Sequence, residues 1–438
     1  MKRVARDPAA PVPVRVERAL RLLPDLEALL PLRALLISTS RPDERQVWSS
    51  SGPYLTLGKR GVQPDDLRRR LGAAVQRMSA HVEALFRAYI EALDADQRRD
   101  GAGVVAALLE AGRLEERVGR STQAQVWYDS ALAVAEALPN RRPEVESLRA
   151  LGELDLGLGR SVEGARHFQR ALALAEAEFD QVGAVGACEG LGDAALAQAQ
   201  WPGAQAWYTR GLRLAQESEQ GPAIGRLLHR LGRLAAQQGD RSAAAEHLRV
   251  AAERFEAAGA AKEMAQLLNS RGTLEADGGQ TAVAAASYRE ALAWARRADA
   301  HDISLEVSIR VNLARLQLGL DRLLEAEEQM RRAEQLAIAA NLVGSLIQVY
   351  LLMGELRGRQ NDAGGFVFFE QAIELCHTLE RSPIFEARAY RAYGEYKNRL
   401  GDREEGRAYQ DRAKEIMSTL GRTDEIERLS EFLTRVSA

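Results

Sequence analysis

Two short stretches of this 438-residue chain hold side chains in an order that chemistry would need. The first is SGPYLTLGKR at residues 51–60, where two glycines precede a lysine. A phosphate-binding loop follows the pattern Gly-x-x-x-x-Gly-Lys-Ser/Thr, because backbone N–H groups wrap the phosphate while the hydroxyl binds Mg²⁺. Here five residues separate Gly52 from Gly58, and Arg60 follows Lys59. We therefore do not expect a nucleotide to bind at this stretch.

The second stretch is Cys376 beside His377, the closest approach to a nucleophile and its base. Adjacent residues of a helix point about 100° apart and do not face each other, so no catalytic pair is expected. Cys188 lies far away in sequence, and both cysteines are expected to be small buried hydrophobic residues. With no metal-ligand or dinucleotide-binding pattern present, the sequence predicts no catalytic, metal or cofactor-binding site and no enzyme.

The composition favours a soluble helical protein that is rich in alanine and leucine. A formal net charge of -3 gives no bulk attraction to nucleic acid or to acidic membranes. The most apolar early segment is interrupted by prolines and charges, so neither a signal peptide nor a membrane-spanning helix is expected. The expected location is therefore cytoplasmic, with no nucleic-acid partner and no membrane insertion.

Prolines divide the chain into regions. Eight of the 13 prolines fall in the first 64 residues, and since proline interrupts helix interiors this part is expected to hold turns, short helices and extended chain. The helical remainder is interpreted below as a stack of repeats, called a solenoid. Such a stack needs a cap at each end, because its last repeat exposes a face. The predicted regions are a proline-rich arm at 1–63, a capping helix at 64–100, eight repeats at 101–420 and a capping helix at 421–438.

Small residues recur along the helical region with a period of about 40 residues. The first series is Gly112, Gly152, Gly192, Gly232, Gly272, Ala314, Gly354 and Gly394. Each unit also carries a later small residue, followed four positions on by a large side chain in most units. The large side chains are Tyr128, Phe168, Tyr208, Leu248, Tyr288, Met330 and Phe369. Each unit is therefore predicted to be two helices, A and B, that cross at the small residues while the large side chain fills the space between them.

A further series of glycines with the same period is expected at helix ends, in the left-handed conformation that glycine adopts without penalty. Its members are Gly119, Gly159, Gly239, Gly279 and Gly319, with Ala199 in the place of one member.

The spacing of these residues resembles the tetratricopeptide repeat. That family's unit has a small residue eight places into helix A, then a small residue and an aromatic in helix B, and an alanine three places later, as in LGELDLGLGRSVEGARHFQRAL at 151–172. HEAT-type repeats of similar period lack this spacing. The resemblance, to the variety with a period of about 40 residues, implies an all-α, right-handed solenoid of about eight hairpins that acts as a protein-interaction scaffold or adaptor.

The concave surface of such a solenoid is formed mainly by its A helices. Counting from the first glycine series places there Glu146, Arg149 and Glu153, then Glu189 and Asp193, and after these the candidate partner-binding residues. The candidates are Arg226, His229, Arg230, Arg233, Asn269, Asn312 and Arg315.

The first four candidates would receive a carboxylate or an acidic peptide through charge-assisted hydrogen bonds. Asn312 begins an Asn-Leu-Ala sequence, and the resemblance to longer-period members implies that it grips a peptide backbone. The alternative is that acidic residues of neighbouring units neutralise the arginines and leave a solvated face without a ligand.

Two other functions stay open. One is self-assembly into homo-oligomers, filaments or tubes through the ends or through the arm, and the other is an effector-sensing regulator, as in the family's bacterial members. The arm holds Trp48, Tyr54, Leu55 and Leu57 among prolines and serines. These apolar side chains predict that residues 37–63 dock on the chain's own N-terminal helices or on the next molecule. The expected partner is a protein or peptide, or a second copy of the chain.

Overall fold

The computed structural model describes residues 80–117, 119–297, 302–340, 342–378 and 383–419, and every regular element in these ranges is a helix. The chain divides between Arg254 and Phe255 into two compact units, and each is described by itself. The predicted arm with Trp48, Tyr54, Leu55 and Leu57, the stretch at 51–60 and the C-terminal capping helix at 421–438 lie outside the described residues.

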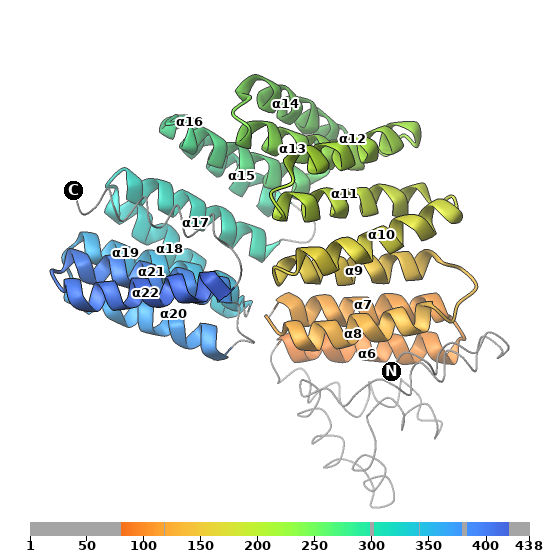
Figure 1. The fold of residues 1–438 in the computed structure, drawn as a ribbon, viewed down its shortest axis with the longest axis horizontal. Coiled ribbons are helices and arrows are strands. Elements are labelled where there is room, and N and C mark those ends of the chain that lie inside the picture. The colour runs from red at the N-terminus through yellow and green to blue at the C-terminus, as the bar shows by residue number, and fades with distance from the viewer. Residues whose placement is uncertain (1–79, 118, 298–301, 341, 379–382, 420–438) are drawn as a thin grey trace, which may run out of the picture. The chain divides into compact units, whose positions relative to one another are not determined.

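Figure 1 labels the helices of the two units in chain order. The first unit holds α6 (Ala80–Gln97), α7 (Gly101–Arg117), α8 (Ser121–Ala135), α9 (Arg142–Gly157), α10 (Ser161–Ala177), α11 (Gln181–Ala197), α12 (Trp201–Glu217), α13 (Gly221–Gln237) and most of α14 (Arg241–Ala257). The second holds α15 (Ala261–Asp277), α16 (Thr281–Arg297), α17 (Ile303–Gly319), α18 (Leu323–Ala339), α19 (Val343–Arg359), a 3₁₀ turn η2 (Ala363–Gly365), α20 (Phe366–Thr378), α21 (Pro383–Arg399) and α22 (Arg403–Thr419).

The predicted all-α solenoid of helix hairpins is confirmed. From α7 to α22 the described helices pair in sequence as A and B partners, α7 with α8 through to α21 with α22. Within the first unit α9 also contacts α7 and α11, so the A helices lie side by side. The described part of the predicted N-terminal capping helix, α6, packs on α7. No described helix is both long enough and apolar enough to cross a membrane.

A large side chain of helix B fills the crossing in most of the hairpins, as the spacing predicts. A Cβ atom on Gly192 would stand 2.2 Å from the ring of Tyr208, and one on Gly152 would stand 2.7 Å from the ring of Phe168. Both rings are fully buried. Since no Cβ atom fits at these distances, the glycines of the first series allow the close helix crossing.

The turns between helices A and B confirm most of the left-handed positions. Gly159 has a φ of +77°, and Ala199 adopts a φ of +56° in the place of the missing glycine. The prediction for Gly319 was wrong, because Gly319 is the last residue of α17 and the positive φ of 58° falls on Asp321. The two-residue insertion that precedes Ala314 in the repeat series moves the turn by the same two residues.

Candidate functional site

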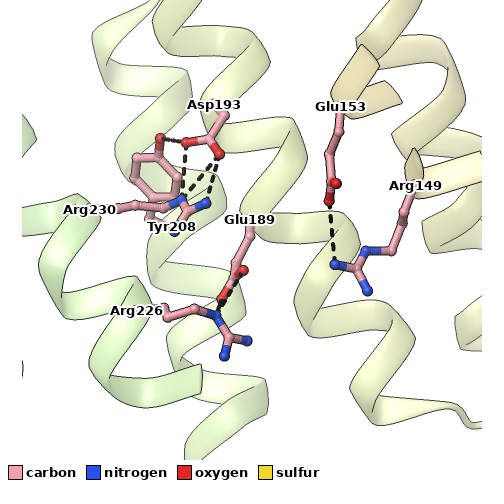
Figure 2. Close-up of polar contacts among 7 residues, drawn as sticks. All are labelled: Arg149, Glu153, Glu189, Asp193, Tyr208, Arg226 and Arg230. Carbon is pink, nitrogen blue, oxygen red and sulfur yellow. Dashed lines mark hydrogen bonds and ion pairs between the residues drawn. The ribbon is translucent and has the colours of Figure 1, made fainter. Parts of the chain in front are cut away.

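The face formed by α9, α11 and α13, here called the A-helix face, gathers charged side chains from three successive repeats. Figure 2 shows Arg149 and Glu153 on α9, Glu189 and Asp193 on α11, and Arg226 and Arg230 on α13. Residues three or four apart share one side of a helix, so each helix presents a short row of these groups.

Arg226 is paired with a carboxylate of its own chain. Its Nε donates to Glu189 Oε1 at 3.2 Å and lies 3.4 Å from Oε2. The side chain of Glu189 is only 8% exposed, whereas that of Arg226 is 37% exposed. The arginine therefore supplies the countercharge for a nearly buried carboxylate, and a ligand at Arg226 would have to compete with Glu189.

Arg230 forms a two-pronged contact with Asp193 on α11. Its Nε lies 3.0 Å from Oδ1 and its Nη2 lies 2.9 Å from Oδ2. The hydroxyl of Tyr208 donates to the same carboxylate at 2.6 Å. Because Tyr208 is also the buried side chain that fills the α11–α12 crossing, Asp193 connects the A-helix face to the core of the hairpin.

His229 and Arg233 complete the four predicted residues on α13. Burial, and then the charges of Arg233 and Arg230, lower the pKa of His229 to about 3. The imidazole is therefore neutral at neutral pH. Its Nε2 is buried and has no hydrogen-bond partner among the described residues. Arg233 is exposed.

The other three candidates lie in the second unit and contact one another. Nδ2 of Asn312 on α17 donates to Oδ1 of Asn269 on α15 at 3.0 Å, and Arg315 donates to Asn312 Oδ1 at 3.1 Å. Burial lowers the pKa of Arg315. Each unit thus brings together its own candidates, and the role of both sets in partner binding stays a prediction.

Sequence reasoning placed Arg149 on this face but did not select it as a candidate. Its Nη2 lies 3.6 Å from Glu153 Oε1, which is an ion pair without a hydrogen bond. The guanidinium lies against Gly186 of α11, where a Cβ atom would stand 2.4 Å from Arg149 Cζ. The available signal was a glycine inside helix α11 at a position that faces the neighbouring helix.

The described residues offer little for covalent or metal chemistry. No group of three or more His, Cys, Asp or Glu side chains in the described ranges is placed to hold a metal ion. Cys188 and Cys376 are both free and buried, as expected. Burial raises the pKa of the Cys188 thiol to about 11 and that of Cys376 to about 12, so neither is a thiolate at neutral pH.

Comparison with known proteins confirms the predicted repeat over part of the chain. Residues 103–177 match the family model of the tetratricopeptide repeat. No curated protein matches the chain significantly.

Solved structures share the helical architecture at low identity. The apo form of the quorum sensor NprR from B. thuringiensis is 14% identical, covers 89% of this chain and 100% of its own, and has a TM-score of 0.49. A Rap protein complexed with competence and sporulation factor is 12% identical, with coverages of 91% and 99% and a TM-score of 0.46. Aspartyl phosphate phosphatase F from Bacillus subtilis is 14% identical, with coverages of 82% and 93% and a TM-score of 0.46. At these values the likeness carries no inference about function.

Proposed function

We propose that this chain, a solenoid of tetratricopeptide repeats, is a non-catalytic scaffold or adaptor that holds a peptide or helix of a partner protein on its A-helix face. The observation that carries the proposal is the two ion pairs that join α13 to α11 on this face. Arg226 and Arg230 are fixed by Glu189 and Asp193, so their orientation is set before a partner arrives. Side chains that are already ordered lose less entropy when a partner binds, which favours recognition at this surface.

The charge balance of the face sets the kind of recognition. Each arginine on α13 that contacts α11 has a carboxylate partner, so positive and negative groups alternate and largely cancel. A partner is then selected by the positions of its hydrogen-bonding groups, since bulk attraction is weak. The imidazole of His229 is neutral and its Nε2 is buried, so His229 adds no charge to the face.

The test is a selection of random nine-residue peptides displayed on phage against the full chain. Selected peptides are then titrated against the wild type and a variant with alanine at Arg226, His229, Arg230 and Arg233. We expect binding to weaken at least about tenfold, because ordered polar contacts are lost from the face. A matched control carries Arg166→Ala and Arg213→Ala, which remove exposed arginines from the B helices α10 and α12 of the same unit.

Two outcomes would count against the proposal. If no peptide is enriched, the solenoid does not act as a peptide-binding scaffold. If binding to the four-alanine variant is unchanged, these residues are not the binding surface. Light scattering over a concentration series addresses the self-assembly alternative, because large ordered particles would contradict a simple adaptor.

A further inference from the structure

The A-helix face has two contacts between neighbouring helices, α9 with α11 and α11 with α13, here called its two junctions. They differ at one repeat position. On α13, Arg226 stands six residues before Gly232 and reaches Glu189, which stands three residues before Gly192 on α11. On α11 the residue six before Gly192 is Gly186, and it faces Arg149, three before Gly152 on α9. The Arg226–Glu189 ion pair of the α11–α13 junction therefore corresponds to Arg149 and Gly186 in the α9–α11 junction.

Arg149 occupies the space that a side chain at residue 186 would fill. A Cβ atom there would stand 2.4 Å from Cζ and 2.6 Å from Nε of Arg149, and the three nearest atoms all belong to this guanidinium. Two other glycines of α11 have a different reason, because Gly190 faces the ring of Phe168 and Gly192 faces the ring of Tyr208. Gly186 lowers helix stability relative to alanine. Its missing side chain leaves a space that the Arg149 guanidinium fills, and this space at Gly186 is here called the seat of Arg149.

One donor of the Arg149 guanidinium, Nε, is unsatisfied, because it is buried and has no hydrogen-bond partner among the described residues. The nearest carboxylate, on Glu153, lies 3.6 Å from Nη2 and is 62% exposed. Figure 2 shows the contrast with Arg226 and Arg230, which both reach carboxylates of α11. A partly buried cation whose nearest carboxylate is beyond hydrogen-bond distance is unfavourable, and a carboxylate bound at the exposed end of the guanidinium recovers part of that free energy.

We propose that Arg149, seated on Gly186, binds a single carboxylate of the peptide held on the A-helix face; this inference rests on the proposed function. The carboxylate belongs to an aspartate or glutamate side chain or to the free C-terminus of the peptide. A guanidinium matches a planar carboxylate with two parallel hydrogen bonds. The negative charge of Glu153 nearby disfavours a doubly charged phosphate relative to a singly charged carboxylate.

The experiment uses the full chain and random nine-residue peptides displayed in two formats, one with a free C-terminus and one with both ends inside the coat protein. Selections run on the wild type, on Arg149→Gln and on Gly186→Glu, which places a carboxylate of the chain itself at the seat. The matched control is Arg391→Gln, since Arg391 holds the same repeat position and also pairs with the glutamate four residues later, its Nε lying 3.7 Å from Glu395 Oε1.

We expect wild-type selections to enrich Asp or Glu at one peptide position, or to enrich peptides only in the free C-terminus format. The preference should vanish in Arg149→Gln and Gly186→Glu and persist in Arg391→Gln. A selected peptide and its copy with Gln or Asn at the acidic position should differ about tenfold in affinity for the wild type, and hardly at all for Arg149→Gln. This peptide comparison on the wild type needs no protein variant.

The failures can be told apart. Enriched peptides without an acidic preference, or a preference that survives both variants at the seat, would overturn the role of Arg149 while the proposed function stands. An equal loss in Arg391→Gln would show a general effect of positive charge and would also overturn the role of Arg149. No enrichment on any protein would remove the proposed function, and this inference with it.

Discussion

The two junctions of the A-helix face solve the same packing problem with different chemistry. Between α11 and α13, two arginines reach two carboxylates, and one of these carboxylates also accepts from Tyr208 in the core. Between α9 and α11, Arg149 rests on a glycine and keeps one buried donor, Nε, without an acceptor among the described residues. The first junction is satisfied by the chain itself, whereas the second leaves a bond to be made by something else. We therefore expect the α11–α13 junction to contribute mainly to stability and the α9–α11 junction mainly to binding.

The largest expected effect compares two glycines of α11. Gly192→Ala places a methyl group 2.2 Å from the buried Tyr208 ring, which cannot move away, so the free energy of unfolding should fall by about 2 kcal/mol. Gly186→Ala meets only the end of the flexible Arg149 side chain, which can swing toward solvent. The better helix propensity of alanine should then raise the stability by about 0.5–1 kcal/mol.

Urea unfolding followed by circular dichroism measures both glycine variants. A loss of stability in Gly186→Ala similar to that in Gly192→Ala would mean that residue 186 is a packing position like residue 192. In that case the proposed difference between the two junctions would be wrong.

The period of the small residues was enough to predict the fold, because the same packing demand acts in every hairpin. Each close crossing needs a residue without a large side chain, and each large partner such as Tyr208 or Phe369 must then be buried. The error at Gly319 arose because counting along the sequence ignored an insertion that shifts the turn. A period therefore predicts crossings well and individual turn residues less well.

The site was harder to predict, because its chemistry depends on pairs of residues far apart in sequence. Arg226 and Arg230 contact carboxylates 37 residues away, and no pattern of residue types distinguishes those carboxylates from a ligand as the partners of the two arginines. Arg149 was on the expected face, but its distinction comes from Gly186, a residue with no side chain of its own. A count of groove-facing polar residues does not register a missing side chain.

A second comparison tests the charged groups of the two junctions. Asp193→Ala removes the acceptor for both Arg230 and Tyr208, so the free energy of unfolding should fall by about 1.5–2 kcal/mol. Glu153→Ala removes an exposed carboxylate that forms no hydrogen bond with Arg149, and should change stability by less than about 0.5 kcal/mol. The same urea titrations give both values. Equal losses would contradict the view that the charged groups of the α11–α13 junction are hydrogen-bonded within the chain while Arg149 in the α9–α11 junction forms no hydrogen bond with its nearest carboxylate.

At neutral pH the smallest expected effect concerns His229, which takes the repeat position that Arg149 and Glu189 hold on the preceding A helices. Its folded-state pKa of about 3 lies below the value of about 6.5 for an unfolded chain. Above pH 6.5 the imidazole is neutral in both states and contributes no pH dependence. As the pH falls from about 6.5 toward 3, the unfolded chain takes up a proton that the folded chain refuses, so stability is lost.

The change that isolates this effect is His229→Gln, compared with the wild type by urea unfolding at several values between pH 7.5 and pH 4.5. Carboxylates titrate in both proteins, so the informative quantity is the difference in their free energies of unfolding. The wild type should lose stability relative to the variant only below about pH 6.5, because the burial of His229 and the charges of Arg233 and Arg230 oppose its protonation. A difference that stays constant across this range would mean that the α11–α13 junction accepts a charged imidazole. The arginines there would then not dominate its electrostatics, and the contrast with the open junction at Arg149 would lose its charge component.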